Sequence, residues 1–231
     1  MEADMTAQVM IDTQNARAIP GPAGLGIAEA GEVLRAAGSV ARFSEGNEIF
    51  AEGDDSDVFY KVLSGVVRVC KFLPDGRRQI EAFHIAGDIF GMELNGTRDL
   101  SAEAVSDCTL VCYRRRTVDM LAEKDEMVTR QLLRFAMENL AHAREHCLLL
   151  GRRGAAEKVA AFLLEWADRS CDPAVVRLAM TRQDIGDYLG LTIETVSRTF
   201  SQFERDGLIA LNGTREVRLT GLEALEDIAA R

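Results

Sequence analysis

Residues 181–207 read TRQDIGDYLGLTIETVSRTFSQFERDG, and this stretch decides how the C-terminal part of the chain folds. Thr181 is a favourable residue at a helix N-terminus, and Asp184, three positions later, resembles the second half of a capping box. Gly190 permits a tight turn after the first helix, and Thr192 is placed to cap a second helix. The stretch therefore predicts two helices joined by a short turn.

The two predicted helices each have an apolar face at helical spacing. The residues expected to point inward are Ile185, Tyr188, Leu189, Ile193, Val196, Phe200 and Phe203. The second helix then turns a polar face outward, formed by Glu194, Thr195, Ser197, Arg198, Ser201, Gln202 and Arg205. The N-terminal part of such a face is where a recognition helix reads base edges in the major groove of DNA.

The chemistry of this polar face suits DNA. Arg198 can make a bidentate contact to guanine, Glu194 can accept from the cytosine amino group, and Ser197 can contact base edges or phosphate. Contacts to the DNA backbone are expected from Thr192, Thr195, Arg182, Ser201, Arg205, Arg215 and Arg218. Glu194 and Arg198 are also spaced for a surface salt bridge. Their position in a two-helix unit with a glycine turn favours DNA reading.

The flanking segments extend this unit into a winged helix–turn–helix domain, predicted over residues 152–231. Before it, GRRGAAEKVAAFLLEWADR predicts a helix with Val159, Phe162, Leu163 and Trp166 on one side. After it, LIALNGTREVRLTG predicts two strands joined by a two-residue turn at Asn212-Gly213.

Residues 117–151 predict one helix of about 30 residues, with an apolar stripe at alternating steps of four and three. The stripe consists of Leu133, Met137, Leu140, Arg144 and Cys147. It can pack within the chain or form the seam of a homodimer. The seam is favoured because so long a helix extends beyond one small domain.

Residues 28–116 predict a β-roll, so the fold class is α+β. Segments rich in β-branched and aromatic residues alternate with glycines, and Asp75-Gly76 is a strong hairpin signal. Turns at intervals of about ten residues favour a compact β-barrel or β-roll. Residues 1–27 form a predicted arm rich in proline and glycine, followed by a short helix that ends at Gly38.

Composition excludes several classes of protein. The chain has 231 residues and a net charge of −10, but residues 152–231 hold 11 Lys/Arg against 13 Asp/Glu, so most of the negative charge precedes them. No apolar run predicts a membrane span or a signal peptide, so a cytoplasmic location is expected. No motif for catalysis or metal binding appears, so we expect neither an enzyme nor a metal site. Most of the five cysteines are expected to be small buried side chains; Cys171, beside Asp172-Pro173, is a hypothetical site of oxidation.

Residues 181–209 strongly resemble the helix–turn–helix of the Crp–Fnr superfamily of bacterial transcription regulators. The pattern Glu194-x-x-Ser197-Arg198 resembles its Fnr-like and FixK-like branches, and the FixK-like branch is the one that has no evident cofactor. EGNEIFAEGDDSDVFYKVLSGVVRV and FHIAGDIFGMEL look like the β-roll of that superfamily. The resemblance implies a homodimer that binds palindromic, TTGAT-like promoter sites in double-stranded DNA and recruits RNA polymerase, with a role in low-oxygen gene regulation.

The same resemblance bears on cofactors. Glu93 matches the carboxylate that binds the ribose of cyclic AMP, but Leu100-Ser101-Ala102 stands where the superfamily has Arg-Ser-Ala, and Arg98 is only a weak substitute. The arm lacks the cysteines of the oxygen-sensing branch, and His84 is a lone candidate for haem. We therefore expect a regulator without a cofactor. The alternatives are gating by a cyclic nucleotide or haem, and a ligand-responsive module whose tail docks protein.

Overall fold

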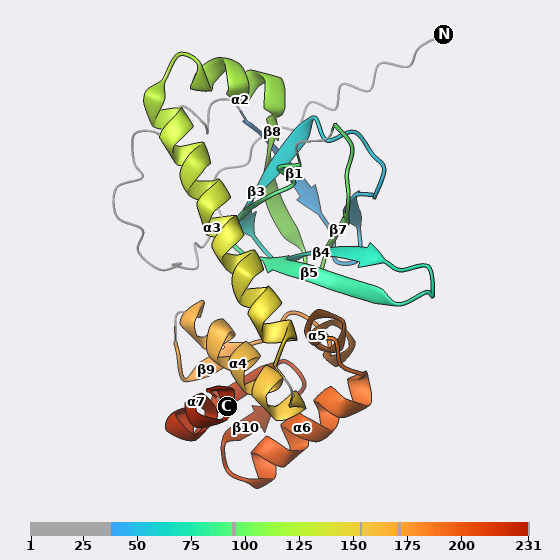
Figure 1. The fold of residues 1–231 in the computed structure, drawn as a ribbon, viewed down its shortest axis with the longest axis vertical. Helices are drawn as coiled ribbons and strands as arrows, with labels where there is room; N and C mark the ends of the chain where they lie inside the picture. Colours follow the sequence, from blue (N-terminus) through green and yellow to red (C-terminus); the bar gives the residue numbers. More distant parts are fainter. Residues whose placement is uncertain (1–37, 94–95, 153, 171, 231) are drawn as a thin grey trace.

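The computed structural model describes residues 38–93, 96–152, 154–170 and 172–230. They form an antiparallel β-roll, a long helix and a smaller helical unit, in that order along the chain (Figure 1). This arrangement confirms the predicted α+β class. The predicted arm and Cys171 lie outside the described residues, as does the predicted short helix except for Gly38, which begins the first strand.

The β-roll consists of two four-stranded antiparallel sheets, ordered β1-β8-β3-β6 and β2-β7-β4-β5. Its strands are β1 (Gly38–Phe43), β2 (Glu48–Phe50), β3 (Val58–Ser64), β4 (Val67–Phe72), β5 (Arg78–His84), β6 (Ile89–Phe90), β7 (Ser101–Ala104) and β8 (Cys108–Arg114). Alternate residues such as Val62, Val67 and Leu110 are fully buried in its core. The predicted turn at Asp75-Gly76 joins β4 to β5, with Gly76 at φ 83°.

The prediction of one helix of about 30 residues is wrong. Two helices occupy this region, α2 (Arg115–Ala122) and α3 (Glu126–Leu150, 25 residues). Asp125 separates them because its backbone is extended and its carboxylate accepts the N–H of Met127, which caps α3. Helix α3 then runs from the β-roll down to the C-terminal unit (Figure 1).

The C-terminal unit combines four helices with a three-stranded sheet ordered β10-β11-β9. Its elements are α4 (Ala155–Asp168), β9 (Val175–Arg177), α5 (Arg182–Leu189), α6 (Ile193–Arg205), β10 (Ile209–Asn212), β11 (Glu216–Leu219) and α7 (Leu222–Ala229). Strand β9 and helix α7 were not expected from the sequence. The predicted wing hairpin is present, but its two-residue turn is wrong: Asn212 pairs with Glu216, so three residues form the loop.

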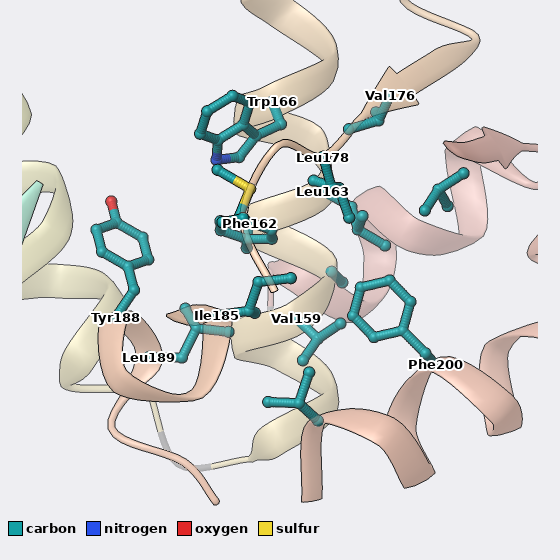
Figure 2. Close-up of a cluster of buried hydrophobic side chains, with 14 of the residues drawn as sticks. Val159, Phe162, Leu163, Trp166, Val176, Leu178, Ile185, Tyr188, Leu189 and Phe200 are labelled. Atoms are coloured by element: carbon teal, nitrogen blue, oxygen red, sulfur yellow. The ribbon is translucent and has the colours of Figure 1, made fainter. Parts of the chain in front are cut away.

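The core of this unit is built around α4. Figure 2 shows Phe162 and Leu163 of α4 between Ile185 of α5 and Phe200 of α6. Trp166 is also buried, as predicted. Each such side chain contributes about 1.5–3 kcal/mol on burial, so the cluster holds the helices in place. Within the described residues, no helix combines the length and apolarity that crossing a membrane requires.

Candidate nucleic-acid interface

The turn between α5 and α6 has the geometry that its sequence predicts. Thr181 and Asp184 exchange the two hydrogen bonds of a capping box, and Thr192 caps α6 by accepting the N–H of Thr195. Gly190 ends α5 in the left-handed region, at φ 64°. Gly186 is required as well, because a Cβ there would lie 2.7 Å from the carbonyl oxygen of Leu191. These contacts fix the direction in which α6 leaves α5.

Helix α6 divides into a buried and an exposed face. Val196, Phe200 and Phe203 are buried, as predicted. The prediction for Ile193 is wrong, since this side chain is 39% exposed. It lies in the first turn of α6, beyond the edge of the core, and the preceding Leu191 packs against the core instead.

Glu194, Ser197 and Arg198 all lie on the exposed face of α6, near its N-terminus. Backbone hydrogen bonding at the helix start, with a bond from Thr192, lowers the pKa of Glu194, so its carboxylate is ionised and can only accept. Arg198 donates to the main-chain carbonyl of Glu194 at 3.3 Å and to the hydroxyl of Thr195 at 3.4 Å. The face therefore presents an anionic acceptor beside a cationic donor, which is the combination that reads a guanine–cytosine pair.

The residues predicted to contact the DNA backbone differ in how freely their side chains are exposed. Ser201, Arg205 and Arg218 are exposed, whereas the hydroxyls of Thr192 and Thr195 bond to each other at the helix cap. Arg215, in the wing loop, lies 3.6 Å from Glu45 of the β-roll. Both side chains of this pair are more than half exposed, so the attraction between them is weak.

The guanidinium of Arg182 is packed against the protein and is not free to bind a phosphate. Its guanidinium lies 3.4 Å from the centre of the Phe200 ring, and its Nη1 is buried without a hydrogen-bond partner. Burial lowers its pKa to about 10. Because α5 packs across α6 at this point, Arg182 covers a core aromatic ring, and this placement does not fit the predicted phosphate contact.

The apolar stripe of α3 is open to solvent in the single chain. Leu133 is 62% exposed and Leu140 43% exposed, and Met137, Arg144 and Cys147 are exposed beside them. The opposite face of the helix buries Val128 and Leu149 against the rest of the chain. Packing within the chain therefore leaves the predicted seam uncovered.

A cavity of about 260 Å³ lies between β5, α3 and α4. Glu93 at its edge is paired with Arg98 at 2.5 Å, and Arg98 is only 2% exposed and stacks over the Phe50 ring. Glu81, Glu165 and Leu100 also line the space. Arg169 also lines the space, but it is already paired with Asp88 at 2.5 Å, so a cyclic phosphate here would face carboxylates, a leucine and an engaged arginine, and the residues present fit a cyclic nucleotide poorly.

The other cofactor candidates are deeply placed side chains. His84 stacks on Phe90 at 5.1 Å, and burial lowers its pKa to about 4. Cys70 and Cys108 are buried, so the prediction of buried cysteines holds for two of the four that the structure describes, and burial raises the pKa of each to about 11. Cys112 is partly buried and Cys147 exposed. Across the described residues, no group of three or more His, Cys, Asp or Glu side chains is placed to hold a metal ion.

Comparison with known proteins identifies relatives along most of the chain. Residues 157–228 match the Crp-like helix-turn-helix domain and residues 40–125 the cyclic nucleotide-binding domain. The chain is 47% identical over 178 residues to the nitrogen fixation regulation protein FixK of Bradyrhizobium diazoefficiens, with 75% of each chain covered. It is 46% identical over 199 residues to the protein of that name in Azorhizobium caulinodans, covering 84% of this chain and 80% of the relative. The solved structure of FixK2 from Bradyrhizobium japonicum is similar at a TM-score of 0.80 and 40% identity, over 84% of this chain and 98% of that one.

Proposed function

The chain belongs to the Crp–Fnr family of DNA-binding transcription regulators, and we propose that it activates promoters by binding a palindromic site as a homodimer. The observation that carries the proposal is the exposed polar face of α6. Its base-reading candidates Glu194, Ser197 and Arg198 follow a capped and rigid turn, so their side chains are presented together. A protein-docking helix would instead expose several apolar anchors there, whereas in α6, which the structure describes in full, Ile193 is the one large apolar side chain that is exposed.

The residues of this face divide into two roles. Glu194 and Arg198 read one guanine–cytosine pair of a TTGAT-like half-site, and Ser197 contacts the neighbouring bases. The exposed Ser201, Arg205, Arg215 and Arg218 contact phosphates and fix the register. Thr192 and Thr195 contribute further contacts to the DNA backbone through their hydroxyls at the start of α6.

The stripe on α3 supplies the dimer. A palindrome requires two recognition helices related by two-fold symmetry, about one turn of DNA apart. The exposed side chains of Leu133, Met137 and Leu140 form a continuous apolar strip that a second copy of the chain would cover. In this arrangement the bound dimer recruits RNA polymerase to the promoter.

The physiological role follows from the relatives. Proteins named nitrogen fixation regulation protein are 41–47% identical to this chain, and FnrL, named a transcriptional activator protein, is 35% identical. We place this regulator in the control of low-oxygen genes, including those of nitrogen fixation. Cys171 remains a hypothetical site of redox control.

Binding without a small ligand is favoured over ligand gating. The ion pair between Arg98 and Glu93 neutralises the carboxylate that a ribose would need, and the guanidinium is buried among aromatic rings. A bound cyclic nucleotide would have to break that pair. The chain therefore uses its β-roll as a scaffold.

The test is DNA binding by the purified, ligand-free protein, measured by fluorescence anisotropy at fixed salt. The probe is a TTGAT-N4-ATCAA duplex, compared with the same duplex scrambled, each with and without cyclic AMP. We expect tight binding to the palindrome alone, unchanged by the nucleotide. Binding that requires cyclic AMP would overturn the ligand-free mechanism, and equal binding to both duplexes would overturn sequence-specific recognition.

A further inference from the structure

Helix α5 is tied to the β-roll by a network of ion pairs. Arg78 of β5 contacts Asp187 at 2.8 Å and also bonds to Asp184, both on α5. Arg68 of β4 lies 3.2 Å from Asp184 and 2.6 Å from Glu103 of β7. Two arginines of one sheet therefore hold two carboxylates of the DNA-binding unit.

These pairs are shielded from water. The side chain of Asp184 is 4% exposed, that of Asp187 12%, and that of Arg78 17%. Charge-assisted hydrogen bonds in such surroundings are stronger than surface pairs, and salt screens them less. The network is therefore a lasting contact, in contrast to the exposed pair at Arg215.

The centre of the same contact is apolar. Phe83 of β5 lies 5.4 Å from Tyr188 of α5 and 6.1 Å from Trp166 of α4, measured between ring centres. His146 of α3 stacks on Tyr188 at 4.0 Å and bonds to its main-chain carbonyl. One continuous core thus spans the β-roll and the DNA-binding unit.

A second attachment lies at the end of α4. Arg169 pairs with Asp88, in the turn after β5, at 2.5 Å, and donates to the carbonyl of Phe83 at 3.3 Å. The unit is held at two separated points, which prevents it from pivoting about either. The contact uses α5 and α4 and leaves the base-reading face of α6 exposed, and α5 lies between β5 and α6 in Figure 1.

We propose that Arg68 and Arg78 are positioning residues for DNA recognition: with Asp184 and Asp187 they clamp the DNA-binding unit to the β-roll and so set the spacing of the two recognition helices in the dimer. This inference rests on the proposed binding to a palindrome. Half-site spacing is a geometric property of the whole dimer, whereas affinity for one half-site depends on α6. Loss of the clamp should therefore change the preference for half-site spacing and leave the affinity for a single half-site unchanged.

The test compares Arg78→Gln with Arg77→Gln in the full-length protein. Arg77 lies on the same hairpin but is exposed and pairs with nearby Asp75 of that hairpin, so it is a matched control. Arg78→Gln leaves Asp184 its contact with Arg68 and Asp187 its hydrogen bond from Gln183, so the fold is retained.

Each variant is titrated with palindromes whose half-sites are separated by two, four or six base pairs, and with a single half-site. We expect Arg78→Gln to weaken binding to the preferred spacing about tenfold, as when the competent population falls to about one tenth. The preference among spacings should shrink and half-site affinity should stay unchanged. Arg78→Lys should restore part of the preference, and Arg77→Gln should match the wild type. A spacing preference in Arg78→Gln equal to that of the wild type would overturn the clamp.

Hydrogen exchange separates this inference from the proposed function, because it needs no DNA. Amides of α5 should exchange faster in Arg78→Gln and in Asp187→Asn than in Arg77→Gln. The double variant should add little to Arg78→Gln, because that change already removes the pair with Asp187, and it should exceed Asp187→Asn by the loss of the bond between Arg78 and Asp184. If the wild type fails to bind the palindrome, the proposed function fails, and exchange still decides the clamp. Equal exchange in all variants would overturn it.

Discussion

The seam on α3 gives the sharpest prediction. Leu133 and Leu140 are 62% and 43% exposed, so together they offer about one leucine surface per helix. A symmetric dimer buries two such surfaces, and burying a leucine is worth about 2 kcal/mol. The double variant Leu133→Gln/Leu140→Gln should therefore lose about 4 kcal/mol of dimerisation free energy, close to a thousandfold in dissociation constant. Glutamine keeps the helix propensity and adds no charge.

Analytical ultracentrifugation over a range of concentrations measures the effect directly. The control is Met120→Gln on α2, because Met120 is 50% exposed but lies off the stripe. Circular dichroism should show an unchanged fold in both, since both sites are on the surface of the single chain. Monomers of the double variant should bind a palindrome poorly. A double variant that dimerises as tightly as the wild type would refute the placement of the seam on α3.

Three further predictions concern single side chains. Arg198→Ala should lose about 1–3 kcal/mol of binding free energy at the cognate site and relax the guanine preference, as measured with duplexes altered at that base pair. Arg215→Ala should weaken binding to all sequences alike and flatten the salt dependence by about one phosphate contact; identical behaviour of these two variants would contradict the division of roles. Burial lowers the pKa of His84 to about 4 from its ordinary 6.5, against the opposing attraction of Asp88 and with repulsion from Arg169 and His142. The unfolded chain therefore binds a proton that the folded chain does not, and stability falls by about 3 kcal/mol between pH 6.5 and 4. His84→Gln should make urea denaturation less sensitive to pH in that window, and parallel curves would exclude this origin.

The helix–turn–helix could be predicted from the sequence because its determinants are local. The capping box joins Thr181 to Asp184, and Gly190 supplies the left-handed residue that ends α5. Contacts within four residues of the chain leave a direct mark on the sequence. The exposed face of α6 follows from the same helical period, so the position of Glu194 and Arg198 on that face could also be predicted from the sequence.

The errors arise where a local signal has two outcomes. Asp125 interrupts an otherwise helical pattern, and it becomes an N-cap because its carboxylate accepts the N–H of Met127. Asn212-Gly213 favours a tight hairpin, but pairing of Asn212 with Glu216 places the glycine in a longer loop. Strand β9 is three residues long and pairs with β11, which is distant in the sequence. A segment this short has no alternation of apolar and polar residues from which a strand could be predicted.

The clamp shows why long-range contacts escape such reasoning, and what they do. Asp184 is fully explained by its local role in the capping box, so nothing in its neighbourhood calls for Arg68 or Arg78, which are 116 and 106 residues away. The fold gives this carboxylate a second role. Thr181 still caps α5 when the arginines are absent, so loss of the clamp would loosen the attachment of α5 to the β-roll without removing the N-terminal cap of the helix. Arg169 and the shared core would still attach the DNA-binding unit to the β-roll, so the unit would keep its recognition chemistry while its position became less strictly fixed.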